Sequence, residues 1–225
     1  MTSTAAVVFD LDDTLYPERA YAFSGFEAVA AEFEDRLGSR SETAAEMRRL
    51  FETEHRPRVF DALLARLGLL HDRELRDAMI RAYREHAPTI SLHPDADRAI
   101  VRLSTLYRLG LITDSWAHAQ QAKITSLGVA DRFDAVIVTA ELGGDFAKPH
   151  PRAFELTAER LAVTAGRCAY VADNPAKDFI APNALGWKTI QIRRADGIYR
   201  DVAPAPDGIP GTVIHTLDDL DGLLV

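Results

Sequence analysis

The sequence has one cysteine, no apolar run of membrane-spanning length and no excess of basic residues. Cys168 has no intramolecular disulfide partner, and the apolar residues up to Ala172 predict a buried thiol in a strand rather than a nucleophile. The lack of a long apolar run argues against a membrane partner. Lys and Arg number 26 against 34 Asp and Glu, a net charge of −8, and no basic stripe alternates with aromatic residues. We therefore expect no nucleic-acid partner.

The first six residues run directly into the apolar Val7, Val8 and Phe9. They carry no basic flank and no small-residue cleavage site, which argues against a signal peptide and favours a cytoplasmic location. A chain of 225 residues is long enough for one core domain with a smaller insertion.

The hydrophobic pattern of the early part of the chain changes from that of a strand to that of helices near Pro17. Residues 7–10 form a short β-branched and aromatic run that predicts a buried strand, and the acidic turn Asp12-Asp13-Thr14 follows it. From Pro17 to about Pro88 the pattern is helical, with Ser41 and Asp72 expected as N-caps and Gly38 and Gly68 as C-terminal stops. The helices expected there span 17–37, 41–54, 57–67 and 72–85.

After His93 the pattern alternates between helices and strands, which predicts repeated βα units, a parallel sheet and an α/β fold. The expected helices span 95–107, 118–127 and 151–161, and the expected strands span 108–113, 135–139, 169–172, 189–192 and 213–214. We therefore expect a catalytic core from residues 1–16 and 92–225 and an inserted helical domain from residues 17–91. An irregular loop is expected over residues 195–211.

Six polar residues lie at or just after the ends of predicted strands, where open α/β sheets place their chemistry. They are Asp10, Asp12, Thr113, Asp114, Lys148 and Asp173. Together they supply a carboxylate nucleophile, a second carboxylic acid, a hydroxyl, an ammonium and a further carboxylate. These are the parts needed for phosphoryl transfer through a covalent aspartyl-phosphate.

Each carboxylate can be given a role. Asp10 is predicted to attack phosphorus, because an ionised carboxylate needs no base to activate it. Asp12 is predicted to protonate the leaving group and then to deprotonate the hydrolytic water. Oxygen ligands from Asp10 and Asp173, with the backbone carbonyl of Asp12, suit Mg²⁺.

The remaining residues are expected to bind or support the phosphoryl group. The Thr113 hydroxyl, backbone donors at Asp114 and the Lys148 ammonium are predicted to contact its equatorial oxygens. Asp178 is expected to accept a hydrogen bond from Lys148 and to hold it in place, and Asn174 is expected to act through its neighbours.

Each motif by itself has an ordinary structural explanation. An acidic turn after a strand is often a solvated connection, as for the turns that begin at Asp10 and Asp173. Thr113-Asp114-Ser115 alone fits a helix N-cap, and Lys148-Pro149 fits a surface turn. Their joint order and their strand context favour a functional site.

The four segments resemble the signature motifs of the haloacid dehalogenase-like hydrolase superfamily. In order, they are residues 9–15 (FDLDDTL), 111–115 (LITDS), 148–151 (KPHP) and 171–178 (VADNPAKD). The resemblance implies a Rossmann-like core with an α-helical bundle cap inserted after the first motif, and a cap that selects the substrate. Members with Asp at position 12 are phosphatases or phosphomutases, whereas true dehalogenases lack it. Dehalogenation is therefore disfavoured.

Two positions depart from the commonest family pattern: Asp114 stands where Asn is frequent, and Ala172 where Gly is frequent. A carboxylate at 114 would repel phosphate if it pointed inward, so the backbone N–H of Asp114 is expected to be the contributing group. The alanine methyl group is tolerable unless position 172 requires a positive φ.

We predict a Mg²⁺-dependent phosphomonoesterase that acts on a small phosphorylated metabolite. Two alternatives stay open: a phosphomutase of the same family, and a non-catalytic phospho-acceptor module, which would need neither a cap nor Asp12. The sequence does not name the substrate, does not separate a monomer from a homodimer, and does not say whether Tyr16, Arg19, Tyr21, Arg56 or Arg58 faces it.

Overall fold

The computed structural model describes residues 3–53, 56–143 and 145–224. The chain divides into two compact units: the core unit, Met1–Glu18 with Ser91–Val225, and the helical unit, Arg19–Ile90. We had expected the divisions after residues 16 and 91, whereas the chain divides after residues 18 and 90. The role of the helical unit as a substrate-selecting cap stays a prediction.

The core unit is built on a six-stranded sheet in which every pairing is parallel. This confirms the α/β class and the parallel sheet predicted from the alternating pattern. The strand order is β3-β2-β1-β4-β5-β6. The strands are β1 (Ala6–Phe9), β2 (Arg108–Thr113), β3 (Ala135–Val138), β4 (Cys168–Ala172), β5 (Lys188–Ile192) and β6 (Thr212–Ile214).

The strand β1 is central because it is apolar on both faces, and all four of its residues are buried. Phe9 pairs with Leu111 of β2 on one side and with Val171 of β4 on the other. The chain adds β2 and β3 on one side of β1 and then returns to add β4, β5 and β6 on the opposite side. This reversal creates a crevice at the carboxyl ends of β1 and β4, where such sheets bind ligands.

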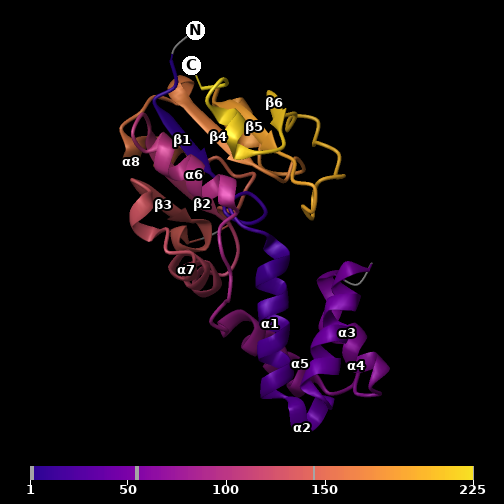
Figure 1. Ribbon diagram of the computed structural model, residues 1–225. Helices are drawn as coiled ribbons and strands as arrows, with labels where there is room; N and C mark the ends of the chain where they lie inside the picture. The colour runs from indigo at the N-terminus through magenta and orange to yellow at the C-terminus, as the bar shows by residue number, and fades with distance from the viewer. Residues whose placement is uncertain (1–2, 54–55, 144, 225) are drawn as a thin grey trace. The chain divides into compact units, whose positions relative to one another are not determined.

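Helices cover the sheet, as Figure 1 shows for α6, which lies in front of β1 and β4. Phe154 of α8 joins a buried apolar cluster with Val8 of β1 and Tyr170 of β4, because alternate strand residues point to the same face. Cys168 belongs to this cluster, and burial raises the pKa of its thiol to about 11, as expected for a structural cysteine. The helices are α6 (Pro94–Leu103), α7 (Ala117–Ser126), α8 (Arg152–Leu161) and α9 (Ile180–Ala184).

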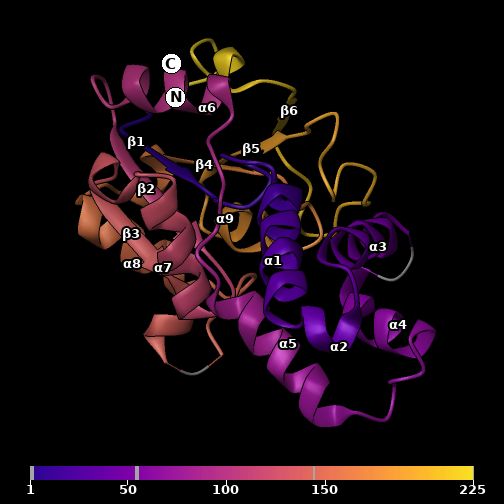
Figure 2. The ribbon, with the colours of Figure 1, turned by 60° about the horizontal axis from the view of Figure 1, so that its bottom comes forward.

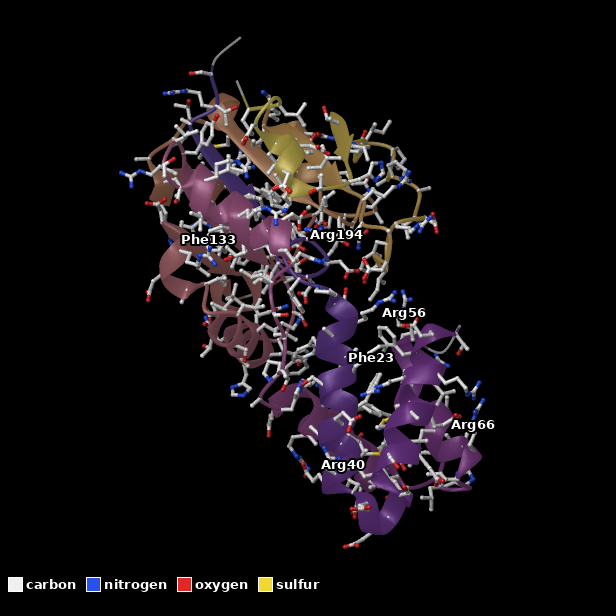
Figure 3. All side chains as sticks on the ribbon, in the orientation of Figure 1. Phe23, Arg40, Arg56, Arg66, Phe133 and Arg194 are labelled. Atoms are coloured by element: carbon white, nitrogen blue, oxygen red, sulfur yellow. The ribbon has the colours of Figure 1, made fainter. Side chains whose placement is uncertain are left out.

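The helices of the helical unit are drawn in Figure 2, and aromatic side chains pack between them. The Phe26 ring lies 5.7 Å from that of Tyr83 and 5.9 Å from that of Phe51, measured between ring centroids. Phe23 extends from α1 toward α3 and meets Phe51 at 5.8 Å (Figure 3). The helices are α1 (Glu18–Glu32), α2 (Glu34–Leu37), α3 (Arg40–Glu52), α4 (Val59–Arg66) and α5 (Arg73–Glu85).

Two predictions for the helical unit were wrong in detail. The single helix expected over 17–37 breaks at Phe33, where φ −112° and ψ 25° leave the helical range. The helix expected from Ser41 begins at Arg40 instead, and its N-cap residue is Ser39, which makes no side-chain cap hydrogen bond. The end expected at Glu54 lies outside the described residues.

The structure confirms other predicted helix ends, namely one N-cap and two glycine stops. The Asp72 carboxylate accepts a hydrogen bond from the backbone N–H of Leu75, as an N-cap does. Gly38 and Gly68 both adopt positive φ after a helix, the conformation that favours glycine at such a position. In the part of the chain that the structure describes, no helix is both long and apolar enough to cross a bilayer.

Candidate active site

The turn after β1 is held in shape by the carboxylate of Asp13. Asp13 has φ 51°, a left-handed conformation that aspartate tolerates better than most residues. Its two carboxylate oxygens accept hydrogen bonds from the backbone N–H of Glu18 at 2.7 Å and of Ile198 at 2.6 Å. These contacts fix the path of residues 10–16, so the two aspartates on either side of Leu11 are presented from a defined backbone.

Asp10 lies at the carboxyl end of β1, where its backbone N–H donates to the carbonyl of Val171. Its Oδ1 lies 2.6 Å from the Nζ of Lys148, and the Lys148 side chain is completely buried. Burial raises the pKa of Asp10 to about 7, and the Lys148 ammonium opposes that rise. A bound cation would favour the ionised form that a nucleophile requires.

The Lys148 ammonium has further polar partners besides Asp10. Its Nζ lies 2.9 Å from Oδ1 of the fully buried Asp178 and donates to the hydroxyl of Tyr170 at 3.0 Å. Burial works against the positive charge, but Asp10 and Asp178 raise the pKa of Lys148 well above its ordinary value. The structure thus brings Lys148 and Asp178 together as an ion pair, but Oδ1 of Asp178 accepts no hydrogen bond from the described residues, so the predicted hydrogen bond is not observed.

Asp173, at the carboxyl end of β4, completes a group of three buried carboxylates with Asp10 and Asp178. Each offers one oxygen, and these oxygens lie within 4.8 Å of one another. Burial and the neighbouring charge of Asp178 raise the pKa of Asp173 well above its ordinary value. Its Oδ2 is buried and has no hydrogen-bond partner among the described residues. Crowded hard oxygen donors with an unpaired oxygen fit a Mg²⁺ ion.

The side chain of Asp12 lines the same cavity as these carboxylates, and its own carboxylate is held by hydrogen bonds to other groups. Its Oδ1 accepts hydrogen bonds from the Nζ of Lys123 at 2.6 Å and from the hydroxyl of Tyr16, and its Oδ2 accepts one from the Gln120 side chain at 3.1 Å. Burial would raise the pKa of Asp12, but Lys123 and the three hydrogen bonds lower it overall. Without substrate Asp12 is therefore ionised and fixed in orientation.

Thr113 and Asp114 follow each other at the end of β2 but face different surroundings. The Thr113 hydroxyl is buried and, within the described part of the chain, has no hydrogen-bond partner. The Asp114 carboxylate accepts hydrogen bonds from Lys177 Nζ at 2.6 Å, from the Thr139 hydroxyl at 2.9 Å and from the backbone N–H of Lys148 at 3.2 Å. The side chain of Asp114 thus meets cationic partners, and the contact of its backbone N–H with phosphate stays a prediction.

Asn174 shapes the turn that follows β4. Its side-chain oxygen accepts from the backbone N–H of Ala176 at 3.1 Å, and its own backbone N–H donates to Asp178 at 3.0 Å. This turn brings Asp173 and Asp178 to the same cavity. These contacts fit the predicted role of Asn174, which is to act on the site through its neighbours.

Most of the carboxylates described above line a cavity of about 230 Å³ at the carboxyl edge of the sheet, whereas Thr113 and Lys148 are not among its lining residues. That volume is enough for a phosphoryl group and a few further atoms of a small ester. The polar lining is mostly acidic, so a bound anion would need compensating positive charge. The cavity is lined by Asp10, Asp12, Glu18, Asp114, Ser115, Lys123, Asp173, Asn174, Lys177, Asp178 and Tyr199.

Several of these residues were missed by sequence reasoning. Lys123 and Gln120 stand three positions apart on α7, so both face Asp12, but no motif marks them. Tyr16, considered as a substrate contact, is fully buried and bonds to Asp12. Burial and the nearby charges of Asp12 and Asp13 raise the pKa of Glu18 to about 8, a property that depends on the folded environment.

Comparison with curated proteins supports this picture. The chain is 33% identical to a glyceraldehyde 3-phosphate phosphatase of Methanopyrus kandleri over 90% of this chain and 88% of that protein. It is 32% identical to a protein of the same name from Pyrococcus abyssi, over 83% and 80% of the two chains. The match to a phosphoserine phosphatase of Thermus thermophilus is 29% identical over 62% and 55% of the chains.

Solved structures match along the whole chain. A haloacid dehalogenase-type phosphatase from Thermococcus onnurineus superposes with a TM-score of 0.63 at 25% identity over 98% of both chains. The magnesium-bound YfnB protein of Bacillus subtilis gives a TM-score of 0.69 at 24% identity over 99% of both chains, a likeness of fold. The sequence profile described as haloacid dehalogenase-like hydrolase matches residues 4–186. The chain therefore belongs to the haloacid dehalogenase-like hydrolase family and groups with its phosphatase-type members.

Proposed function

We propose that the protein is a Mg²⁺-dependent phosphomonoesterase in which Asp10 becomes transiently phosphorylated. One observation carries the proposal: the buried Asp10 carboxylate meets the Lys148 ammonium at 2.6 Å within a group of three carboxylates at the carboxyl edge of the sheet. In this proposal Asp10 is the nucleophile, the Lys148 ammonium is the fixed positive charge and the group of carboxylates is the cation site.

The bound phosphoryl group would be held by residues that are already in position. The buried Thr113 hydroxyl is available to donate to a phosphoryl oxygen, and Lys148 supplies a positive charge beside Asp10. Asp10 and Asp173 would hold the Mg²⁺ ion with the backbone carbonyl of Asp12, and Asp178 would keep Lys148 in place. When bound, the metal ion supplies positive charge that stabilises the phosphoryl oxygens.

In the first half-reaction an Asp10 oxygen attacks phosphorus as the bond from phosphorus to the ester oxygen breaks. The departing oxygen takes a proton from Asp12, so the products are an alcohol and a phosphorylated Asp10. Asp12 must be protonated at that moment. The negative charge of a bound phosphate raises the proton affinity of Asp12, which offsets the effect of Lys123.

In the second half-reaction Asp12 acts as a base. It takes a proton from a water molecule whose oxygen attacks phosphorus, and the bond between phosphorus and Asp10 breaks. Inorganic phosphate leaves and Asp10 returns as a carboxylate. Asp12 releases the proton that it took from water once the phosphate is gone, and it takes one up again when the next substrate binds. Lys123, Gln120 and Tyr16 keep the Asp12 carboxylate in one orientation for both steps.

The substrates that we propose to test first are small phosphorylated metabolites. Three-carbon esters head the panel because the names of similar proteins specify glyceraldehyde 3-phosphate and phosphoserine. A relative from Halopiger xanaduensis, 30% identical over 82% of this chain and 83% of its own, is named ribulose-1,5-bisphosphate 5-phosphatase. Sugar bisphosphates therefore form the second group of the panel.

The experiment measures phosphate release from this panel with Mg²⁺ and with a chelator. Asp10→Asn is the nearly isosteric test variant, and Asp97→Asn is the matched control, because Asp97 pairs with Arg132 on the surface of the core unit. We expect release by wild type and Asp97→Asn with Mg²⁺ only, and none by Asp10→Asn. Release by Asp10→Asn would refute the mechanism, and conversion of an ester to its isomer without release would favour the phosphomutase alternative.

A further inference from the structure

Lys177 and Asp114 form an ion pair at the edge of the active-site cavity. The Lys177 Nζ lies 2.6 Å from Oδ2 of Asp114, and both residues line the cavity with Asp10 and Asp173. The two side chains come from different parts of the fold, since Asp114 follows β2 and Lys177 lies in the turn between β4 and α9. The tertiary structure therefore creates this pair next to the nucleophile.

The lysines around the cavity differ in how far a ligand can reach them. Lys148 is fully buried and holds Asp10 and Asp178, and Lys123 is 7% exposed and holds Asp12. The Lys177 side chain is 37% exposed, and it holds Asp114. Of these three lysines, Lys123 and Lys177 line the cavity, and Lys177 is the more accessible of the two to an incoming anion.

The charge of Asp114 creates a need for such a cation. Its side chain is 13% exposed and its Oδ2 lies 4.0 Å from Lys148 Nζ, so it stands close to where a phosphoryl group would meet Lys148. A lone carboxylate at that distance from a dianion would repel it, and the low local dielectric would strengthen the repulsion. Lys177 neutralises this carboxylate and still exposes N–H groups.

Both members of the pair are fixed before any ligand arrives. Asp114 also accepts hydrogen bonds from the Thr139 hydroxyl at 2.9 Å and from the backbone of Lys148 at 3.2 Å. The backbone N–H of Lys177 donates to the carbonyl of Asn174 at 3.3 Å, within the turn that also holds Asp178. A lysine held in this way loses less conformational entropy on binding an anion than a free one.

We propose that Lys177 binds the phosphoryl group of the substrate and that Asp114 positions the Lys177 ammonium for this contact. The assignment rests on the proposed function, because it places the phosphoryl group beside Asp10. Lys177 is then a substrate-binding residue that adds a second lysine to the phosphate site. Asp114 is a positioning residue, and its negative charge weakens phosphate binding when Lys177 is absent.

The test measures the affinity for inorganic phosphate, the reaction product, by titration calorimetry in the presence of Mg²⁺. Lys177→Met should weaken phosphate binding by roughly tenfold to a hundredfold, as expected for loss of one charged hydrogen bond. Lys177→Arg should recover most of that affinity. Adding Asp114→Asn to Lys177→Met should tighten phosphate binding relative to Lys177→Met alone, because it removes the unpaired negative charge.

Arg132→Met is the matched control, because it removes a 2.7 Å surface ion pair with Asp97, and it should leave the phosphate affinity unchanged. Thermal melting without phosphate identifies any variant that fails to fold, and Lys177→Arg and the double variant keep the test open in that case. A purely structural pair predicts altered melting temperatures with equal phosphate affinity in all variants, and that result would overturn the assignment.

The two proposals fail in different ways. A wild type that hydrolyses esters while Lys177→Met keeps full phosphate affinity overturns the role of Lys177 alone. A wild type that binds phosphate through Lys177 but releases none from any ester refutes the proposed hydrolysis and leaves the Lys177 assignment standing. Absence of phosphate binding in the wild type overturns the assignment directly.

Discussion

Two ion pairs of nearly equal length show how differently the core unit and the helical unit use charge. Lys148 meets Asp10 at 2.6 Å in the core unit, and the Lys148 side chain is 0% exposed. Arg49 meets Glu46 at 2.8 Å in the helical unit, and the Arg49 side chain is 51% exposed. Desolvation makes the first pair expensive to assemble, whereas the second adds little to stability. A contribution to stability therefore does not account for the buried pair, whereas the proposed role of Lys148 in the reaction does.

The two units also differ in what they bury. The helical unit is stabilised around rings such as Phe26 and Tyr83, and ion pairs such as that of Arg36 with Asp72 lie near its surface. The core unit instead buries several carboxylates beside one cavity, an arrangement that is tolerated only when cations compensate. Charge substitutions should then act mainly on activity in the core unit, and apolar substitutions should act mainly on stability in the helical unit.

Lys148→Met should give the largest effect. Removal of the ammonium leaves Asp10 and Asp178 unpaired, and activity should fall by about a hundredfold to a thousandfold or more. An uncompensated buried charge costs about 3 to 5 kcal/mol, part of which Mg²⁺ binding offsets. Phosphate release and chemical denaturation measure the two effects. Near-normal activity would contradict the role given to the buried pair.

Phe26→Ala should be the most damaging single change in the helical unit. Phe26 is 2% exposed and meets rings from three other segments, so its truncation should cost about 3 to 5 kcal/mol in free energy of unfolding. Phe26→Leu, which keeps most of the volume, is the matched variant and should lose less. Equal losses in denaturant titrations of both variants would argue against ring packing as the cause.

Lys123→Met tests whether α7 holds Asp12 ready for proton transfer. Asp12 loses its 2.6 Å partner, and hydrolysis of alkyl phosphates, whose leaving group needs a proton, should slow by about a hundredfold. Aryl phosphates with acidic leaving groups should be affected much less. Lys123→Arg is the control that retains the charge. The comparison is made on kcat/KM, which reports the phosphorylation step and not the later hydrolysis that all esters share; equal slowing of that step for both classes of ester would mean that Lys123 does not act through Asp12.

Magnesium should stabilise the protein more at high pH than at low pH. The folded-state pKa of Asp10 is raised to about 7, so its contribution to metal-free stability is present below the unfolded value near 3.8 and is lost as pH rises through about 7. Mg²⁺ binds the ionised carboxylates, so its stabilisation grows over that same range. Each added kcal/mol should raise the melting temperature by about 2 to 4 °C. Melting curves at pH 5.5 and 8 test this, with Asp173→Asn as the variant that should respond weakly.

Arg49→Ala should give the smallest effect. Glu46 keeps its contact with Arg66, and the exposed pair contributes at most about 0.5 kcal/mol. Denaturant unfolding of Arg49→Ala beside Arg49→Lys measures this directly. A loss of several kcal/mol would break the contrast between exposed and buried pairs.

Much of the fold could be predicted from local patterns. Periodicity located the strands that carry Asp10, Thr113 and Asp173, because buried parallel strands read as apolar runs that end in polar turns. Helix boundaries were less certain: the break at Phe33 carries no glycine or proline signal, and the helix near Ser41 begins one residue earlier. Boundaries of this kind depend on tertiary packing.

The predicted site residues lie in recognisable sequence motifs, but most of the residues that they contact do not. Lys148 and Asp178 meet as an ion pair. The contacts of Asp12 with Gln120 and Lys123, and of Asp114 with Lys177, join segments that only the sheet brings together. The environment of the Asp114 side chain could not be predicted for the same reason, since it depends on a lysine 63 positions later in the chain.

The most direct test of the account is to trap the phosphorylated enzyme. The protein is mixed with a hydrolysed ester and Mg²⁺, quenched in acid within one turnover, digested and examined by mass spectrometry. The account predicts the added mass of one phosphoryl group on the peptide that contains Asp10, and its absence from the Asp10→Asn variant. Phosphate release by an active wild type with the phosphoryl group on another residue, or on none under these conditions, would contradict Asp10 as the nucleophile.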